Sequence, residues 1–190
     1  EFVAVIFDSG VPRIYDEAGK EETVLAYPLG VFVVRDLLLK AKVGTPGWEG
    51  LRADVHDRIE LIRDITPENL GIDAAQLNEL LVEVPQTTSL QQIEAWAQQA
   101  GASDAFAAMI SRDVGAKFPR ITPDTTIQLR RRFIFGLAEQ DRVAATIEFL
   151  AQGDMPTVFE LVRLSHAGDY DEEVEDAELL QIAAAARRAD

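Results

Sequence analysis

Residues 129–166 read LRRRFIFGLAEQDRVAATIEFLAQGDMPTVFELVRLSH, and this stretch decides the fold that the sequence predicts. Apolar side chains recur three or four positions apart in both halves of it, which is the spacing of two amphipathic helices. Gly153 is suited to a left-handed cap that ends the first helix. Asp154 is suited to the N-cap of the second helix, and Pro156 to its first turn. We therefore expect a helical hairpin that turns at Gly153-Asp154.

The composition of the chain narrows the classes of function. The formal net charge is −15, from 18 basic and 33 acidic residues among 190. A negative field of this kind argues against nucleic acid and anionic membranes as partners. No segment approaches the roughly 18 apolar residues of a membrane span, and the apolar opening FVAVIF lacks the basic lead-in of a secretory signal. We expect a cytoplasmic protein.

Cysteine is absent and only two histidines occur. The missing cysteines exclude disulfides, thiolate catalysis and cysteine-ligated metal sites, and two histidines do not make a histidine-rich metal site. Any catalytic chemistry would therefore depend on carboxylates, hydroxyls or basic side chains.

The first third of the chain predicts one strand, one loop and one helix. Residues 2–7 (FVAVIF) form a compact apolar run that ends at Asp8-Ser9-Gly10, as a buried strand entering a turn would. Residues 12–23 are polar and predict a loop. Residues 24–42 favour a helix with Pro28 in its first turn.

A run of short helices is predicted over residues 54–114. The expected helices are His56–Arg63, a short one capped by Thr66, Ala74–Val84 capped by Asp73, Ser89–Ala100, and Asp104–Val114 capped by Ser103. Residues 115–128 are irregular in pattern, and a last helix is expected at 176–188. The acidic run over 169–178 lacks the alternating oxygens and glycine of a calcium loop, so we interpret it as a solvated surface.

The 129–166 stretch contains four short motifs in a fixed order. They are Arg130-Arg131-Arg132, Glu139-Gln140-Asp141-Arg142-Val143, Gly153-Asp154 and Ser165-His166. The set resembles the C-terminal half of galactokinase-like sugar kinases of the GHMP superfamily, in the branch that includes L-arabinokinases. Phe135 departs from the family, which has a histidine there.

The resemblance implies a fold and a domain organisation. We expect an α+β but predominantly helical region, like the C-terminal region of a GHMP kinase, with one N-terminal strand and about eight helices. Residues 1–190 would form a single incomplete domain with a helical insert at 54–114.

The opening stretch FVAVIFDSGVPR also resembles a strand of this family, and Ala26-Tyr27-Pro28 resembles the galactokinase segment whose tyrosine approaches the sugar. The implied substrate-binding residues are Tyr27, Asp8 and Arg13. This sequence has Gly30 and Val31 at the positions where the family has arginines. It has Pro12-Arg13 where the family has Arg-His. Tyr27 also fits a half-buried tyrosine in the first turn of a helix that only packs.

Two further residues are placed near the substrate side by the resemblance. Ser165 and His166 would contact the substrate-binding residues without touching the substrate itself. A histidine at the end of an amphipathic helix also commonly caps carbonyl groups or packs, and this alternative stays open. The arginines at 130–132 could neutralise a phosphate, or face water and pair with local acids.

The activity that the resemblance implies is ATP-dependent phosphorylation of a monosaccharide of the galactose or L-arabinose type, forming a sugar 1-phosphate. ATP and Mg²⁺ are expected for the intact kinase. This sequence lacks the family's phosphate loop and catalytic Asp, so we assign it no catalytic, cofactor-binding or metal-binding residue, and expect it to be inactive and to bind no cofactor strongly alone. Its expected partners are the sugar and either the N-terminal kinase half or further copies of the chain, covering exposed apolar surface.

Two other classes of protein fit parts of the sequence. One is a non-catalytic helical module that regulates or binds another protein. The other is a haloacid-dehalogenase-like phosphatase, whose nucleophile would be Asp8 at the end of the opening strand. Gly10 stands where such an enzyme needs a second acid to protonate the leaving group. Asp8 also fits a plain turn former.

Overall fold

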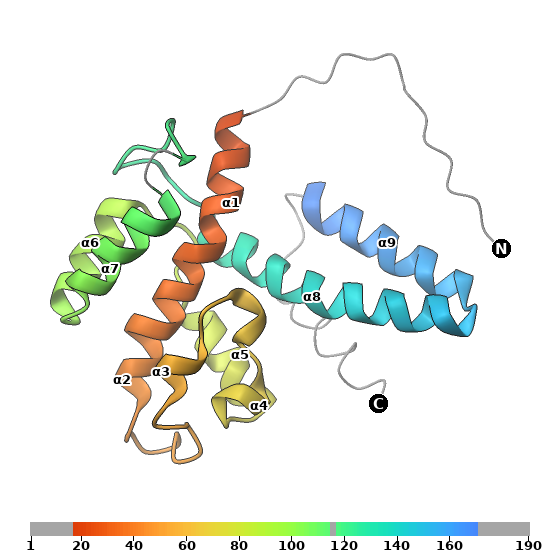
Figure 1. The fold of residues 1–190 in the computed structure, drawn as a ribbon, viewed down its shortest axis with the longest axis horizontal. Coiled ribbons are helices and arrows are strands. Elements are labelled where there is room, and N and C mark those ends of the chain that lie inside the picture. The colour runs from red at the N-terminus through yellow and green to blue at the C-terminus, as the bar shows by residue number, and fades with distance from the viewer. Residues whose placement is uncertain (1–16, 115–116, 171–190) are drawn as a thin grey trace.

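A computed structural model describes residues 17–114 and 117–170, and every regular element among them is helical (Figure 1). The α-helices are α1 (Glu17–Phe32), α2 (Lys40–Lys42), α3 (Val55–Arg58), α4 (Pro67–Leu70), α5 (Ala74–Glu83), α6 (Leu90–Gln99), α7 (Ser103–Met109), α8 (Leu129–Gln152) and α9 (Met155–Tyr170). Two π-helical segments, Val33–Leu39 and Ile110–Val114, and the 3₁₀-helix Ile62–Asp64 complete them.

One continuous helical rod runs through the centre of the molecule. It consists of α1, the π-helical segment Val33–Leu39 and α2. Figure 1 shows α3, α4 and α5 beside its C-terminal part, α6 and α7 along another side, and α8 crossing it. The rod is apolar on nearly all sides from residue 25 to residue 39, and most of its side chains there belong to the single hydrophobic core. A helix that is apolar all round is a buried helix, which explains its central position.

The crossing of α1 and α8 depends on one glycine from each helix. A Cβ atom at Gly30 would lie under 3.0 Å from three ring carbons of Phe133. A Cβ atom at Gly136 would lie under 3.0 Å from two ring carbons of Tyr27. Each helix thus places an aromatic ring where the other has no side chain, and the two backbones can approach closely.

The hairpin of α8 and α9 confirms the expectation from residues 129–166. Gly153 ends α8 with a positive φ of 76°, in the left-handed region that favours glycine. The carboxylate of Asp154 accepts hydrogen bonds from the backbone N–H and the hydroxyl of Thr157, at 3.2 and 2.6 Å. These bonds lower the pKa of Asp154 below its usual value. The turn is therefore encoded locally.

Two of the predicted N-caps in the 54–114 run are also confirmed. Thr66 accepts a hydrogen bond from the N–H of Asn69, with Pro67 as the first helical residue of α4. Asp73 forms a reciprocal capping box with the glutamine three residues later, at the start of α5. Ser89 was expected as the first residue of its helix, and it instead caps α6 through a box of the same kind. Side-chain capping signals in the sequence located these helices correctly.

The prediction of a loop over residues 12–23 was wrong for its described part, because residues 17–23 belong to α1. Contacts distant in sequence hold this polar turn in place. Glu21 accepts hydrogen bonds from the backbone N–H and guanidinium of Arg120, and Glu22 accepts one from the N–H of Gln128. Pro28 consequently lies inside α1 and not in its first turn.

The predicted helix His56–Arg63 was wrong beyond Arg58, where α3 ends. The carboxylate of Asp64 accepts the N–H groups of Glu60 and Leu61, at 2.9 and 2.7 Å, so these donors are not available for a continuing helix. A smaller correction concerns Ser103, which is the first residue of α7 and does not cap it.

The predominantly helical character is confirmed, whereas the α+β class stays a prediction. The expected strand at 2–7 and the expected helix at 176–188 lie outside the described residues. Within 17–114 and 117–170 there is no strand, and β pairing is limited to an isolated bridge between Thr88 and Ile127. In the same ranges, no helix combines the length and the apolar character that crossing a membrane requires.

We predict that Gly30→Ala destabilises the fold by about 1–3 kcal/mol, because the new methyl group overlaps the Phe133 ring at the α1–α8 crossing. Phe133→Ala should also destabilise it, by leaving a cavity. In the double variant the methyl group partly occupies that cavity, so the combined loss should be smaller than the sum. Urea unfolding followed by circular dichroism measures all three. Losses that add within about 0.5 kcal/mol would show that the two residues do not interact.

Candidate functional site

A cavity of about 590 Å³ lies beside the middle of the central rod. Its wall comes from residues 24–35 of the rod, from residues 60–63, from Met109, Arg112, Asp113, Lys117 and Phe118, and from Gln140 of α8. Its size is within the range of about 300–1,000 Å³ that is typical of small-molecule sites. Apolar side chains such as Phe32 and Phe118 make up much of the wall, and the half-buried Tyr27 contributes its ring.

Basic side chains outnumber acidic ones in the cavity wall. Arg35, Arg63, Arg112 and Lys117 line it, together with the acidic Glu60 and Asp113. The whole chain has the opposite balance, with a net charge of −15. The cavity is thus a local basic region in an acidic protein, which suits a ligand that carries negative charge or many hydroxyl groups.

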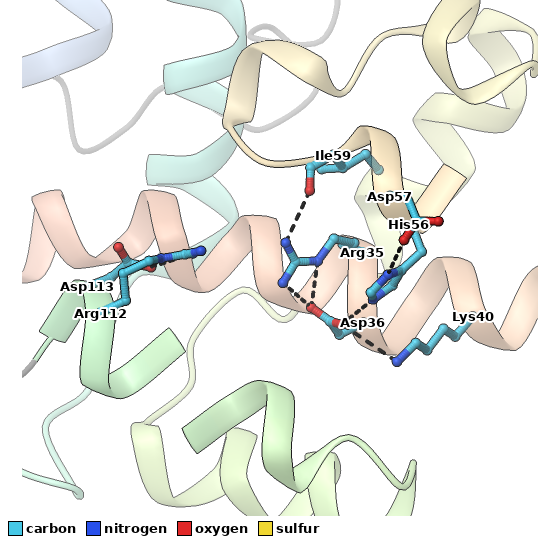
Figure 2. A network of polar contacts seen from close by, with 8 residues as sticks. All are labelled: Arg35, Asp36, Lys40, His56, Asp57, Ile59, Arg112 and Asp113. Atoms are coloured by element: carbon cyan, nitrogen blue, oxygen red, sulfur yellow. Dashed lines mark hydrogen bonds and ion pairs between the residues drawn. The ribbon is translucent and has the colours of Figure 1, made fainter. Parts of the chain in front are cut away.

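Asp36 organises the polar contacts at one edge of this cavity (Figure 2). It lies in the π-helical segment of the rod and is completely buried. Its carboxylate accepts hydrogen bonds from Nε and NH2 of Arg35, at 2.8 and 2.7 Å. NH1 of Arg35 also donates to the carbonyl oxygen of Ile59, at 3.1 Å. Arg35 is therefore held on two sides while it lines the cavity.

The second carboxylate oxygen of Asp36 binds two further groups. Nε2 of His56 lies 2.6 Å from it, and Nζ of Lys40 lies 3.6 Å from it. A carboxylate only accepts hydrogen bonds, so Nε2 of His56 carries the proton that is shared with Asp36. The buried charge is compensated by three basic or ionisable neighbours, which is the condition under which a protein tolerates a buried carboxylate.

Arg112 and Lys117 form the opposite part of the basic lining. Nε and NH2 of Arg112 donate to the same carboxylate oxygen of Asp113, at 2.9 and 2.7 Å. This contact raises the pKa of Arg112 above its usual value, so the guanidinium stays charged. Nζ of Lys117 donates to the carbonyl oxygen of Arg112, at 2.9 Å.

A second polar cluster lies between α8 and α9. Arg142 has only 3% of its side chain exposed and forms an ion pair with Glu139 one turn earlier. The hydroxyl of Ser165 on α9 donates to Glu139 at 2.7 Å. The guanidinium lies 5.7 Å from the centre of the Phe135 ring, in the range of a cation–π contact. Burial lowers the pKa of Arg142, and its Nε and NH2 hydrogen-bond to none of the described residues.

The structure brings some of the residues predicted from sequence together and leaves others apart. Tyr27 lines the cavity, and Ser165 contacts Glu139 of the motif at 139–143. His166 belongs to α9, but its side chain lies outside the described part of the structure. Asp8 and Arg13 also lie outside the described residues.

The arginine cluster at 130–132 does not line the cavity. Nε of Arg130 donates to the carbonyl oxygen of Val84, the residue that follows α5, and its backbone N–H donates to the carbonyl oxygen of Pro85. Arg130 thus serves to join the start of α8 to the end of α5, a structural role.

The sequence interpretation missed Arg35, Asp36 and His56. One signal could have found the first two: Arg35 and Asp36 are the only charged residues within the apolar run LGVFVVRDLLL, at 29–39. Charged residues in a buried stretch are normally paired. His56 gave no comparable signal, because its contact with Asp36 spans 20 residues of sequence.

Comparison with family models, curated proteins and solved structures finds no match to this chain. Between residues 17 and 114 and between 117 and 170, no three carboxylate, histidine or cysteine side chains gather in a group that could hold a metal ion.

We predict that Asp36→Asn destabilises the fold by about 3–5 kcal/mol, because Arg35, Lys40 and His56 would lose a common buried counter-charge. The matched control is Asp57→Asn, which removes an exposed carboxylate that also lies near His56. The control should unfold at nearly the wild-type urea concentration. Equal effects of the two substitutions would contradict a special role for Asp36.

We also predict that Glu139→Gln destabilises the fold on the order of 3 kcal/mol, because it leaves the buried guanidinium of Arg142 without its counter-charge. Adding Arg142→Met should recover most of the loss. The control pair is Glu160 and Arg163, which has the same spacing on the surface of α9, so Glu160→Gln should change stability little. Thermal unfolding measures these variants, and a double variant less stable than Glu139→Gln alone would refute the explanation.

Proposed function

We propose that this chain is the substrate-side portion of an ATP-dependent monosaccharide kinase of the galactose or L-arabinose type. One observation carries the proposal. The cavity is lined both by Tyr27 and by Gln140, which come from the two stretches that resemble galactokinase-like kinases. These stretches are more than 100 residues apart in sequence, and the fold places them at one cavity of suitable size.

The contact between the two stretches supports the same proposal. The ring of Tyr27 packs on Gly136, three residues before Glu139. Glu139, Arg142 and Ser165 then meet between α8 and α9, so members of two separate family-like motifs are in contact. Contacts of this kind give the spacing of these motifs a physical reason, because moving one motif along its helix would break them.

The cavity chemistry suits a sugar. Arginine, glutamine, carboxylate and phenol groups can hydrogen-bond to sugar hydroxyls, and aromatic rings can pack on the C–H face of the ring. The cavity has these groups in Arg35, Gln140, Glu60 and Tyr27. The phosphate loop, the catalytic base and the magnesium ligands of the reaction would come from the remaining part of the kinase, since positioning and charge stabilisation by such groups drive phosphoryl transfer.

An exposed apolar surface on the hairpin is where that remaining part would bind. Val143 and Ile147 on α8 and Phe159 and Val162 on α9 are each more than half exposed. The same surface also favours the second candidate function, a non-catalytic module that binds another protein. A sugar titration separates the two candidates, because only the kinase portion should bind a monosaccharide at the cavity.

We predict that the chain binds galactose or L-arabinose in calorimetric titrations, with a dissociation constant on the order of micromolar to millimolar. Tyr27→Phe keeps the ring against Gly136 and removes the hydroxyl, so it should weaken binding by about threefold to tenfold. Gln140→Ala should also weaken it, because Gln140 lines the cavity.

The control for these variants is Gln91→Ala, which alters an exposed glutamine on α6 outside the cavity. It should bind sugar as the wild type does. No binding of either sugar by the wild type would refute the kinase proposal and leave the protein-binding module.

A further inference from the structure

The charge of the cavity lining is not explained by a neutral sugar as the ligand. Four basic side chains line it against two acidic ones, and Asp36, which pairs with Arg35 at the cavity edge, offsets one further positive charge. Acidic residues nevertheless outnumber basic ones in the chain as a whole. Neutral sugars need hydrogen-bond donors and acceptors but no excess of positive charge. A surplus of cations in one concave site is typical of a site that compensates an anionic ligand.

Arg35 and Arg112 are both pre-oriented by acidic neighbours. Each uses Nε and NH2 to bind one carboxylate, Asp36 for Arg35 and Asp113 for Arg112. A guanidinium has five N–H donors, so each arginine has further N–H groups beyond those used in these bonds. Figure 2 shows the guanidinium of Arg112 pointing along the rod on the side of Arg35, and both residues line the cavity.

The backbone at the cavity argues for a carboxylate over a phosphate group. Phosphate sites usually rely on free backbone N–H groups at a helix N-terminus. Near this cavity, the N–H groups of Glu60 and Leu61 already donate to Asp64. The positively charged donors in the lining are guanidinium and ammonium side chains, and the planar fork of arginine matches a planar carboxylate.

We propose that the ligand of this cavity is an acidic monosaccharide of the uronic acid class, whose carboxylate binds Arg112 and Lys117 together with Arg35. The sugar ring then lies against Tyr27 and Gln140. This inference rests on the proposed kinase function and refines its substrate class. Asp36 acts as a positioning residue, since it holds Arg35 in the cavity wall without reaching the ligand.

Calorimetric titration of the whole chain with D-galacturonate, D-galactose and D-galactose 1-phosphate tests the inference. Galacturonate should bind about tenfold to a hundredfold more tightly than galactose. This gain in affinity corresponds to one or two charge-assisted hydrogen bonds. Added salt should reduce this preference, because the cavity is open to solvent ions.

Arg112→Gln should reduce galacturonate binding to the level of galactose and leave galactose binding nearly unchanged. Its matched control is Arg163→Gln, which removes an arginine that binds Glu160 through the same two nitrogens on the surface of α9. Lys117→Gln is the second test variant, because Lys117 is exposed and its loss should not affect folding.

The outcomes separate the inference from the function on which it rests. If galactose binds as tightly as galacturonate, the acidic-sugar inference is wrong and the kinase proposal stands. Tighter binding of galactose 1-phosphate than of galacturonate would assign the basic residues to a phosphate and also overturn the inference. If none of the three ligands binds, the kinase proposal itself fails.

Discussion

The crossing of α1 and α8 is the constraint on which the rest of the structure depends. Gly30 and Gly136 allow the two backbones to approach, and Phe133 and Tyr27 fill the space that each glycine leaves on the opposite helix. Packing of this kind is specific, because protein interiors are close-packed and a single added methyl group changes the stability of the fold. The crossing fixes the position of α8 relative to the rod, and with it the side of the cavity that Gln140 closes.

A buried charge sets the second constraint. Asp36 lies in the middle of the apolar rod, where an unpaired carboxylate would be costly, and it is tolerated because three basic or ionisable side chains surround it. The π-helical turn that contains Asp36 is a feature that occurs frequently at functional sites. Through Arg35, this buried group determines the geometry of one edge of the cavity. Under the proposed function, Asp36 would connect stability with ligand binding.

The distribution of charge divides the molecule into two environments. Most of the chain is acidic, which favours solubility and repels anions at long range. The cavity has the reverse balance, and its arginines stay oriented because Asp36 and Asp113 bind them. An anionic ligand of the proposed class would therefore gain electrostatic binding free energy at the cavity and not on the acidic surface.

The sequence by itself determined the local structure. Gly153-Asp154, Thr66 and Asp73 identified the hairpin turn and two helix starts, because capping depends on side chains within three or four residues. It also placed Tyr27 as a candidate site residue, through the family resemblance.

Only the tertiary structure decided the extent of α1 and the composition of the cavity. Glu21 and Glu22 hold the first turns of α1 through bonds to residues about 100 positions later, and no local pattern encodes such pairs. The contact of Asp36 with His56 arises in the same way, as does the position of Tyr27 and Gln140 in the wall of one cavity. Helical periodicity predicts which face is buried, but which helices bury it together is decided by packing over the whole chain.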